Sequence, residues 1–188
     1  RDDSWLSAVE SQMAEAGTAI AAARRDMVSR LEAAEVTSED NVFPDADLAL
    51  EGALEKALDA GPREGVERDF AENLRAWRRR DAEAGRALTG PHRSDLLVTH
   101  RAKGRPARLC STGEQKALLI GLVLANARAL SLSDPHAPLI LLLDEIAAHL
   151  DEGRRAALFD ILDDLGFQAF MTGTDKSLFE AWGPRAQH

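Results

Sequence analysis

Apolar residues recur at helical spacing along the first part of the chain. From residue 1 to about residue 35 their period predicts one long helix. The apolar stripe of this helix consists of Trp5, Leu6, Val9, Met13, Ile20, Met27, Val28 and Leu31. A second long helix is predicted over about residues 63–86, with a stripe formed by Val66, Phe70, Leu74 and Trp77. We expect Trp5 and Trp77 to pack in a core rather than to serve as stacking platforms.

Shorter elements lie between these two helices. Residues 47–51 alternate between apolar and polar positions as a strand does, and residues 52–59 predict a helix that stops at Gly61-Pro62. The first 87 residues therefore predict a helical arm rather than a compact sheet domain.

From about Leu88 onward the pattern is that of an α/β sheet. The predicted order is a strand at 95–100, a basic loop at 101–109, a helix at about 112–130, a strand at 139–143, a helix at about 152–165 and a strand at 167–171. The continuously aliphatic run 139–143 is typical of a strand buried on both faces of a parallel sheet. The β–α–β order at the end of the chain predicts an α/β fold.

Composition narrows the class of protein without identifying it. The 188 residues carry a net charge of −9 and a single cysteine, Cys110, which excludes an internal disulfide and suits a reducing cytoplasm. No secretory signal and no run of 18 apolar residues occurs, so we expect neither a membrane-spanning helix nor a membrane partner. Because the chain lacks an initiator methionine and opens inside a predicted helix, we interpret it as a fragment.

Positive charge is concentrated in the middle of the chain. Residues 75–108 hold ten Lys or Arg and three acids, a local charge of +7 that leaves −16 for the rest. Such a strip can bind nucleic-acid phosphates, and it can equally be a solvated helix face with a loop. The DNA-binding residues predicted within it are Arg93, Arg101, Lys103, Arg105 and Arg108.

Two acids, Asp144 and Glu145, follow the aliphatic strand. In α/β sheets, ligands sit at the carboxyl ends of the strands. Asp144 could hold Mg²⁺, which prefers carboxylate and water oxygens. Glu145 could orient or deprotonate the water that attacks a phosphate. The simpler alternative is that Asp144 only caps the segment that follows.

A glycine-containing turn, Ser111-Thr112-Gly113-Glu114-Gln115-Lys116, precedes Asp144 by 33 residues and one predicted helix. Ser111 followed by Glu114 is the pattern of a capping box, so the turn could simply be a well-made helix start. A helix N-terminus with exposed amides and a glycine is also an anion site. The Ser-x-Gly-x-Gln order and the spacing resemble the signature loop of ABC-type ATPases, which contacts the γ-phosphate bound by another subunit, and the two acids resemble their Walker B motif.

Further motifs resemble the RecF family of DNA-repair ATPases over about residues 88–175. They are Gly90-Pro-His-Arg-Ser-Asp95, Cys110-Ser-Thr-Gly-Glu-Gln-Lys116 and Asp144-Glu-Ile-Ala-Ala-His-Leu-Asp151. Leu150-Asp151 occupy the D-loop position, although Asp151 could also simply cap the next helix. The resemblance implies a partial helical arm (lobe II) at residues 1–87 and the C-terminal part of an ABC-ATPase head (lobe I) at residues 88–188.

For function, the resemblance implies an ATP-dependent homodimer on gapped or junction DNA, with ATP and Mg²⁺ as cofactors. RecR, RecO and RecA would be the partners, in recombinational repair and replication restart. ATP hydrolysis would be slow. We expect little or no ATP binding by this chain alone, because it contains no Gly-x-x-x-x-Gly-Lys-[Ser/Thr] (Walker A) loop.

The strand after the two acids ends in Met171-Thr-Gly-Thr-Asp175, where ABC heads usually carry a histidine. Thr172 or Thr174 could sense the γ-phosphate in its place. His149 is another candidate, although a histidine in such a loop is more often a surface or capping residue. The segment from Gly173 imitates a phosphate loop, but Asp175 stands where a second glycine is needed.

Two other classes of protein stay open. The first is the head of a different ABC-type ATPase, either a transporter, which lacks a helical arm of this size, or a chromosome-maintenance protein, which needs much longer heptad repeats. The second is a non-enzymatic module that docks a partner. Against this second class, the residues of the signature and of the acid pair keep the chemistry that their roles require.

Overall fold

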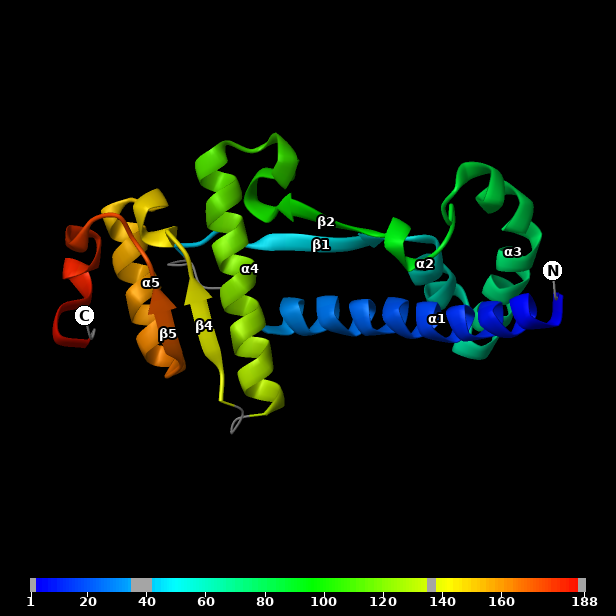
Figure 1. Cartoon of the computed structure of the whole chain (residues 1–188). Coiled ribbons are helices and arrows are strands. Elements are labelled where there is room, and N and C mark those ends of the chain that lie inside the picture. The colour runs from blue at the N-terminus through cyan, green and yellow to red at the C-terminus, as the bar shows by residue number, and fades with distance from the viewer. Residues whose placement is uncertain (1–2, 35–41, 135–137, 186–188) are drawn as a thin grey trace. The chain divides into compact units, whose positions relative to one another are not determined.

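The helices and strands of the computed structural model (Figure 1) follow the sequence pattern closely, and the structure describes residues 3–34, 42–134 and 138–185. The helices are α1 (Asp3–Ala34), α2 (Ala53–Ala60), α3 (Arg63–Ala84), α4 (Thr112–Ser133) and α5 (Glu152–Leu165). The strands are β1 (Ala46–Glu51), β2 (Asp95–His100), β3 (Arg105–Pro106), β4 (Ile140–Leu143) and β5 (Gln168–Met171).

One short strand was not predicted. Within the basic segment expected to be a loop, β3 pairs antiparallel with β2 through Thr99–Pro106 and His100–Arg105. Gly104 closes the turn between them at φ 55°, a left-handed conformation that glycine adopts without a steric penalty. The resulting sheet has the order β1-β2-β3.

The chain forms two compact units, each built from two segments. One comprises Arg1–Ser29 and Leu48–Leu97, and the other comprises Arg30–Asp47 and Val98–His188. These bounds do not coincide with the boundary expected between residues 87 and 88, because α1, β1 and β2 contribute residues to both units. The division into arm and head at that boundary stays a prediction.

In the first unit, α1 turns small residues toward the core. Ala14, Ala21, Gly17 and Thr18 are buried, and the core also contains Leu54 of α2 with Val66, Phe70 and Leu74 of α3. A Cβ atom at Gly17 would lie 2.8 Å from the Phe70 ring, so only glycine permits this approach of helix to helix. The predicted α3 stripe is thereby confirmed for Val66, Phe70 and Leu74.

The predicted apolar face of α1 is only partly confirmed, because Leu31 is buried but several larger apolar residues are exposed. Trp5 is 64% exposed, and Met13, Ile20 and Met27 also lie on the solvent side. The physical reason is that the core selects for close approach, which small side chains allow, rather than for the largest apolar side chains. Trp77 is half-buried, and the Arg80 guanidinium lies 4.7 Å from its ring centroid.

The second unit is built around a parallel strand pair. β4 and β5 pair in register from Ile140–Gln168 to Leu143–Met171, which confirms the predicted β–α–β unit. Leu141, Leu143, Ala169 and Met171 share one face and pack into a core with α4 and α5. From the helices and loops this core takes Phe43, Ala117, Ile120, Leu124, Leu150, Leu158, Phe159 and Leu162.

The opposite face of this strand pair is open in the second unit. Ile140 is 57% exposed, Leu142 74% and Phe170 53%. The prediction that the strand at 139–143 is buried on both faces is therefore wrong for these 188 residues. The sequence pattern misleads because both faces of β4 are aliphatic, whereas only one of them meets α4 and α5.

Among the described helices, α4 alone is long and apolar enough to cross a membrane by length and composition. A helix at the centre of a protein core has the same two properties. In the second unit α4 buries seven residues, from Ala117 to Ala129, whereas Leu119, Leu130 and Leu132 are exposed.

Two substitutions on the same strand should differ sharply in their cost. Leu143→Ala removes a side chain that is 3% exposed and should lower the free energy of unfolding by about 2–5 kcal/mol. Leu142→Ala changes a side chain that is 74% exposed and should cost less than about 0.5 kcal/mol. Urea unfolding of the 188-residue chain measures both. An equally large cost at Leu142 would show that the open face is covered in solution.

Candidate nucleotide site and nucleic-acid surface

The two acids stand at the carboxyl end of β4. Because β4 and β5 are parallel and Leu143 pairs with Met171, the residues that follow each strand, Asp144 and Thr172, lie side by side. The Thr172 amide donates to the Leu143 carbonyl at 3.1 Å and so extends the ladder by one step. The strand register thus places an acid and a hydroxyl at the same point of the sheet.

Thr172 links both acids. Its hydroxyl donates to the Asp144 carboxylate and accepts a hydrogen bond from the Glu145 amide at 3.0 Å. All three residues are exposed. Of the two threonines predicted as γ-phosphate sensors, the structure brings Thr172 to the acids. Thr174 has no hydrogen bond within the described part of the chain.

Glu145 has a strained backbone. Its φ of 52° makes it the one non-glycine residue with positive φ in the described ranges. This left-handed conformation costs a residue with a side chain about 1 kcal/mol or more, and such strain concentrates at functional sites. Here the turn directs the Glu145 amide at Thr172.

The donor set at this point fits Mg²⁺ shared with a phosphate better than a metal held by protein alone. No group of three or more His, Cys, Asp or Glu that could hold a metal ion occurs in the described residues. Mg²⁺ is commonly bound through one or two carboxylates together with phosphate and water oxygens. Asp144 provides one such carboxylate, with the Thr172 hydroxyl beside it.

The turn that resembles a signature loop, residues 111–116, is called the signature turn below. It forms the capping box that its sequence predicts. Ser111 is the N-cap of α4, and its amide donates to Glu114 Oε2 at 2.8 Å. In return, the Ser111 Oγ accepts from the Glu114 amide at 3.4 Å. The Gln115 side chain donates to the Cys110 carbonyl at 2.9 Å, and Cys110 itself is buried as a small apolar residue.

Glu114 is also bound by a lysine from the β2–β3 turn. Lys103 Nζ forms an ion pair with Glu114 Oε1. This ion pair, together with the hydrogen bonds from Ser111, lowers the pKa of Glu114 from its usual 4.5 to about 2. The carboxylate therefore stays charged across the physiological range, with both oxygens in use.

The fold does not require a glycine at position 113. A Cβ atom there would meet no atom within 4 Å, and the φ of this residue is not positive. Thr112, Gly113 and Gln115 are exposed, and Lys116 is half-buried. The open backbone at Gly113 suits the close approach of a group from outside the unit.

The residues after the acids combine core and capping roles. Leu150 is 7% exposed and belongs to the core, and the Asp151 carboxylate accepts from the Arg154 amide at 2.8 Å as the N-cap of α5. The side chain of His149 lies outside the described residues. Asp175 accepts from the Ser177 amide at 2.9 Å, which lowers the pKa of Asp175 and makes this segment a local turn rather than a phosphate loop.

The structure does not join the signature turn to the acids. Within the described part of the chain, no hydrogen bond or ion pair connects Ser111–Lys116 with Asp144, Glu145 or Thr172. The two groups stand separately in the second unit, and their shared role as a nucleotide site stays a prediction.

The basic strip is partly neutralised. Arg101 donates to the Asp47 carboxylate at 2.7 Å and to the Ala46 carbonyl at 3.0 Å, and Lys103 is held by Glu114. Arg93, Arg105 and Arg108 are exposed and form no ion pair with any described residue. These three are the cations of the predicted set whose charge stays available for a phosphate.

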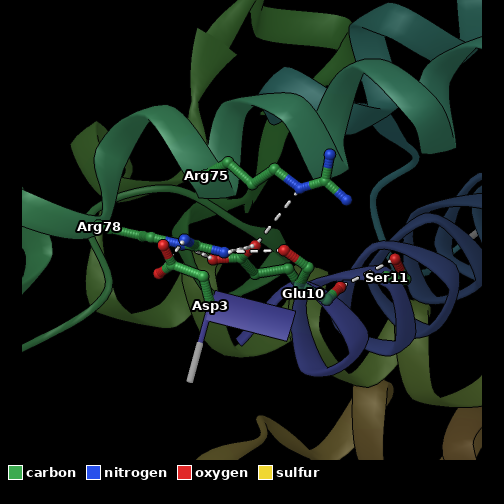
Figure 2. A network of polar contacts seen from close by, with 6 residues as sticks. Asp3, Glu10, Ser11, Arg75 and Arg78 are labelled. Carbon is green, nitrogen blue, oxygen red and sulfur yellow. Dashed lines mark hydrogen bonds and ion pairs between the residues drawn. The ribbon is translucent and has the colours of Figure 1, made fainter. Parts of the chain in front are cut away.

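Two arginines of α3, Arg75 and Arg78, pair with a buried acid of α1 (Figure 2). Glu10 of α1 is 7% exposed and accepts from two nitrogens of Arg78, at 2.5 and 2.7 Å, while Arg75 lies 3.6 Å away. The hydrogen bonds from Arg78 lower the pKa of Glu10. Glu10 falls on the same helical face as Ala14 and Ala21, and this spacing is the feature of the sequence that indicates its burial.

The Gly90–Asp95 motif has a structural role in the first unit. The Pro91 carbonyl accepts from Arg24 at 2.5 Å, the Ser94 hydroxyl donates to buried Glu55 at 2.8 Å, and His92 Nε2 lies 3.0 Å from the Ala87 carbonyl. Glu55, which is 2% exposed, was not singled out from the sequence.

Curated proteins of known name are similar to this chain in sequence. No family model matches the sequence. The chain is 59% identical over 193 residues to the DNA replication and repair protein RecF of Brucella abortus (strain 2308), covering 99% of this chain and 48% of that protein. It is 57% identical over 189 residues to RecF of Mesorhizobium japonicum, covering 100% of this chain and 49% of that protein. The chain belongs to the RecF family. It spans about half the length of the curated RecF relatives that it matches.

Two solved RecF structures share the fold. The recombination mediator protein RecF-ATPrS in the RecFOR pathway matches with a TM-score of 0.74 and 22% identity, covering 95% of this chain and 47% of that one. The corresponding RecF-ATP structure matches with a TM-score of 0.70 and 20% identity, covering 94% of this chain and 46% of that one. The predicted fold class, an α/β fold with a helical lobe, is confirmed, and it is the fold of these RecF structures.

The interactions of Glu114 should make the free energy of unfolding depend on pH in the acid range. A carboxyl whose pKa is lowered on folding contributes stability that is present above the unfolded pKa and is lost as the pH falls toward about 2. Glu114→Gln should therefore reduce stability above about pH 5, and this difference from the wild type should shrink as the pH falls to about 3. Urea midpoints of the 188-residue chain across this range measure it. Salt at about 1 M should also shrink the difference, since the ion pair is exposed. A difference independent of pH would contradict the assignment.

Proposed function

We propose that this RecF-family chain forms part of an ATP-dependent DNA-repair ATPase. The observation that carries the proposal is the cluster at the end of β4, where Thr172 joins Asp144 to Glu145. A capped signature turn with an open glycine stands in the same unit. Identity of 59% to a RecF protein over nearly the whole chain favours this function over a transporter or a chromosome-maintenance head.

ATP would be sandwiched between two subunits in this proposal. The amides and lysine that cradle the β- and γ-phosphates would come from a Walker A loop, which does not occur in these 188 residues. The signature turn of one subunit, Ser111–Lys116, would approach the γ-phosphate on the other. Leu150 and Asp151 would run beside it as the D-loop. The ATP-bound RecF structures, which share the fold, support a nucleotide role.

Glu145 would act as the general base in hydrolysis. It would accept a proton from water as the water oxygen bonds to the γ-phosphorus and the bond to the bridging oxygen breaks. Asp144 would hold Mg²⁺, directly or through water, and the metal would neutralise charge on the phosphates. Thr172, already hydrogen-bonded to Asp144, would report whether the γ-phosphate is present.

DNA would bind through exposed cations. Arg93, Arg105 and Arg108 are the members of the predicted set that form no ion pair with any described residue. The preferred substrate would be gapped or junction DNA, bound by an ATP-dependent homodimer in the cytoplasm. RecR and RecO would help it to load RecA, and the RecFOR pathway named for the solved neighbours supports these partners.

The proposed function is tested by Glu145→Gln in the full-length native protein. Removing the base should slow ATP hydrolysis by about 10²-fold or more while leaving ATP binding intact. Affinity for gapped duplex DNA, measured by fluorescence anisotropy at fixed salt, should rise with Mg-ATP and stay high in this variant. ATP-driven dimerisation without DNA affinity would keep the ATPase class and exclude the DNA-repair role. Unchanged hydrolysis would remove Glu145 from the mechanism.

Gly113→Ala separates a nucleotide role from a folding role. Because the added Cβ meets open space, the 188-residue chain should keep its stability or gain about 0.4–1 kcal/mol. In the full-length protein the same methyl group should obstruct the phosphate and weaken ATP-dependent dimerisation, measured by light scattering. Gly65→Ala, in the first turn of α3, is the matched control and should leave dimerisation unchanged. Equal dimerisation in both variants would count against the signature assignment.

A further inference from the structure

Lys103, one of the predicted DNA-binding residues, forms an ion pair with the signature turn. Lys103 lies in the β2–β3 turn, and its ammonium group pairs with the carboxylate of Glu114. The other oxygen of that carboxylate accepts the Ser111 amide at 2.8 Å. Lys103 is therefore one carboxylate away from the residue that would meet the γ-phosphate.

The turn that carries Lys103 is fixed at its other side. The Arg101 amide donates to the Asp45 carbonyl at 3.0 Å, and the Arg101 side chain donates to Asp47 at 2.7 Å. Gly104 then reverses the chain into β3. The turn is thus held at Arg101 and, through Lys103, is joined to Glu114.

The two hydrogen bonds between Ser111 and Glu114 differ in length. The bond from the Ser111 amide to Glu114 is 2.8 Å, whereas the bond from the Glu114 amide to the Ser111 hydroxyl is 3.4 Å. Ser111 is exposed, and its hydroxyl accepts the longer of these two hydrogen bonds. The charged carboxylate, steadied by Lys103, fixes the backbone from which that hydroxyl projects.

The free cations lie on the same stretch of chain. Arg105 belongs to β3, directly after the turn, and Arg108 lies three residues before Ser111. Both are exposed without an ion pair among the described residues. A phosphate bound by them would immobilise the segment between Lys103 and Ser111. DNA would then bind near the start of the segment 103–111, and the nucleotide would contact its end.

We propose that Lys103 is a positioning residue that couples DNA bound at Arg105 and Arg108 to the nucleotide contact at Ser111, through Glu114. The inference rests on the proposed function and extends it. Lys103 touches neither ligand. Its ion pair keeps the turn and the signature in one arrangement, so that order imposed by DNA at the turn is passed to Ser111. DNA at the turn would raise the affinity for ATP. Because linkage is reciprocal, ATP at Ser111 would raise the affinity for DNA by the same factor.

The test compares two lysine substitutions in the full-length native protein. Lys103→Met keeps an unbranched side chain and removes the charge, and Lys103→Arg keeps the charge. Affinity for a gapped DNA duplex is measured by anisotropy over a range of salt concentrations, with and without Mg-ATP. Lys103→Met should leave affinity without ATP and its salt slope unchanged and should reduce the stimulation by ATP about fivefold or more. Lys103→Arg should restore the stimulation.

Arg105→Met is the matched control for a direct DNA contact. It should lower the affinity for DNA in the absence of ATP and reduce the salt slope by about 0.9. If Lys103→Met behaves in this way, Lys103 contacts DNA itself and the coupling role is excluded.

The remaining outcomes separate the two proposals. Stimulation by ATP that is present in the wild type and unchanged in Lys103→Met overturns the coupling role alone. Absence of stimulation in the wild type overturns the proposed function, and the coupling role with it. Circular dichroism of each variant establishes that a lost response is not a loss of fold.

Discussion

The pairing of Leu143 with Met171 in the parallel ladder is the contact on which the acid cluster depends. A slip of one residue would turn the core side of each strand toward solvent, so packing and register are fixed together. The side chains that enforce the register are Leu143, Met171 and their neighbours on the core face. Because that core holds the strands in place, Asp144 and Thr172 follow them at adjacent positions. The position of polar groups at the site is thereby a consequence of apolar packing beneath it.

Periodicity was sufficient to predict the α-helices and every strand except the two-residue β3, whereas burial needed knowledge of their packing partners. The α3 stripe was predicted because Phe70 and Leu74 are both large and inward-facing. On α1 the same argument failed, since the inner face is lined by small residues such as Gly17, which the Phe70 ring approaches. On β4 the aliphatic run carries no alternation, so it does not say which face is covered. Size and hydrophobicity report that a residue can be buried, and only the packing partner decides whether it is.

The site was predictable where chemistry is local in sequence. Ser111 with Glu114, and Asp144 with Glu145, are contained in short motifs, and the structure shows the capping box that the first of these predicts. Thr172 and Thr174 could not be separated by sequence, because only the strand register brings one of them to the acids. The partners of the basic residues were not predictable. Arg101 reaches Asp47 across 54 positions of sequence, a pairing that no count of charges contains.

Charge pairing changes what the basic middle of the chain can do. A local excess of positive charge suggests a broad electrostatic surface, but several cations of the strip are already bound to carboxylates. What stays open is a smaller set that includes Arg105 and Arg108, next to the signature turn in sequence. In the proposed function, the part of the salt dependence of DNA affinity that this chain contributes would follow the number of phosphates that these cations neutralise.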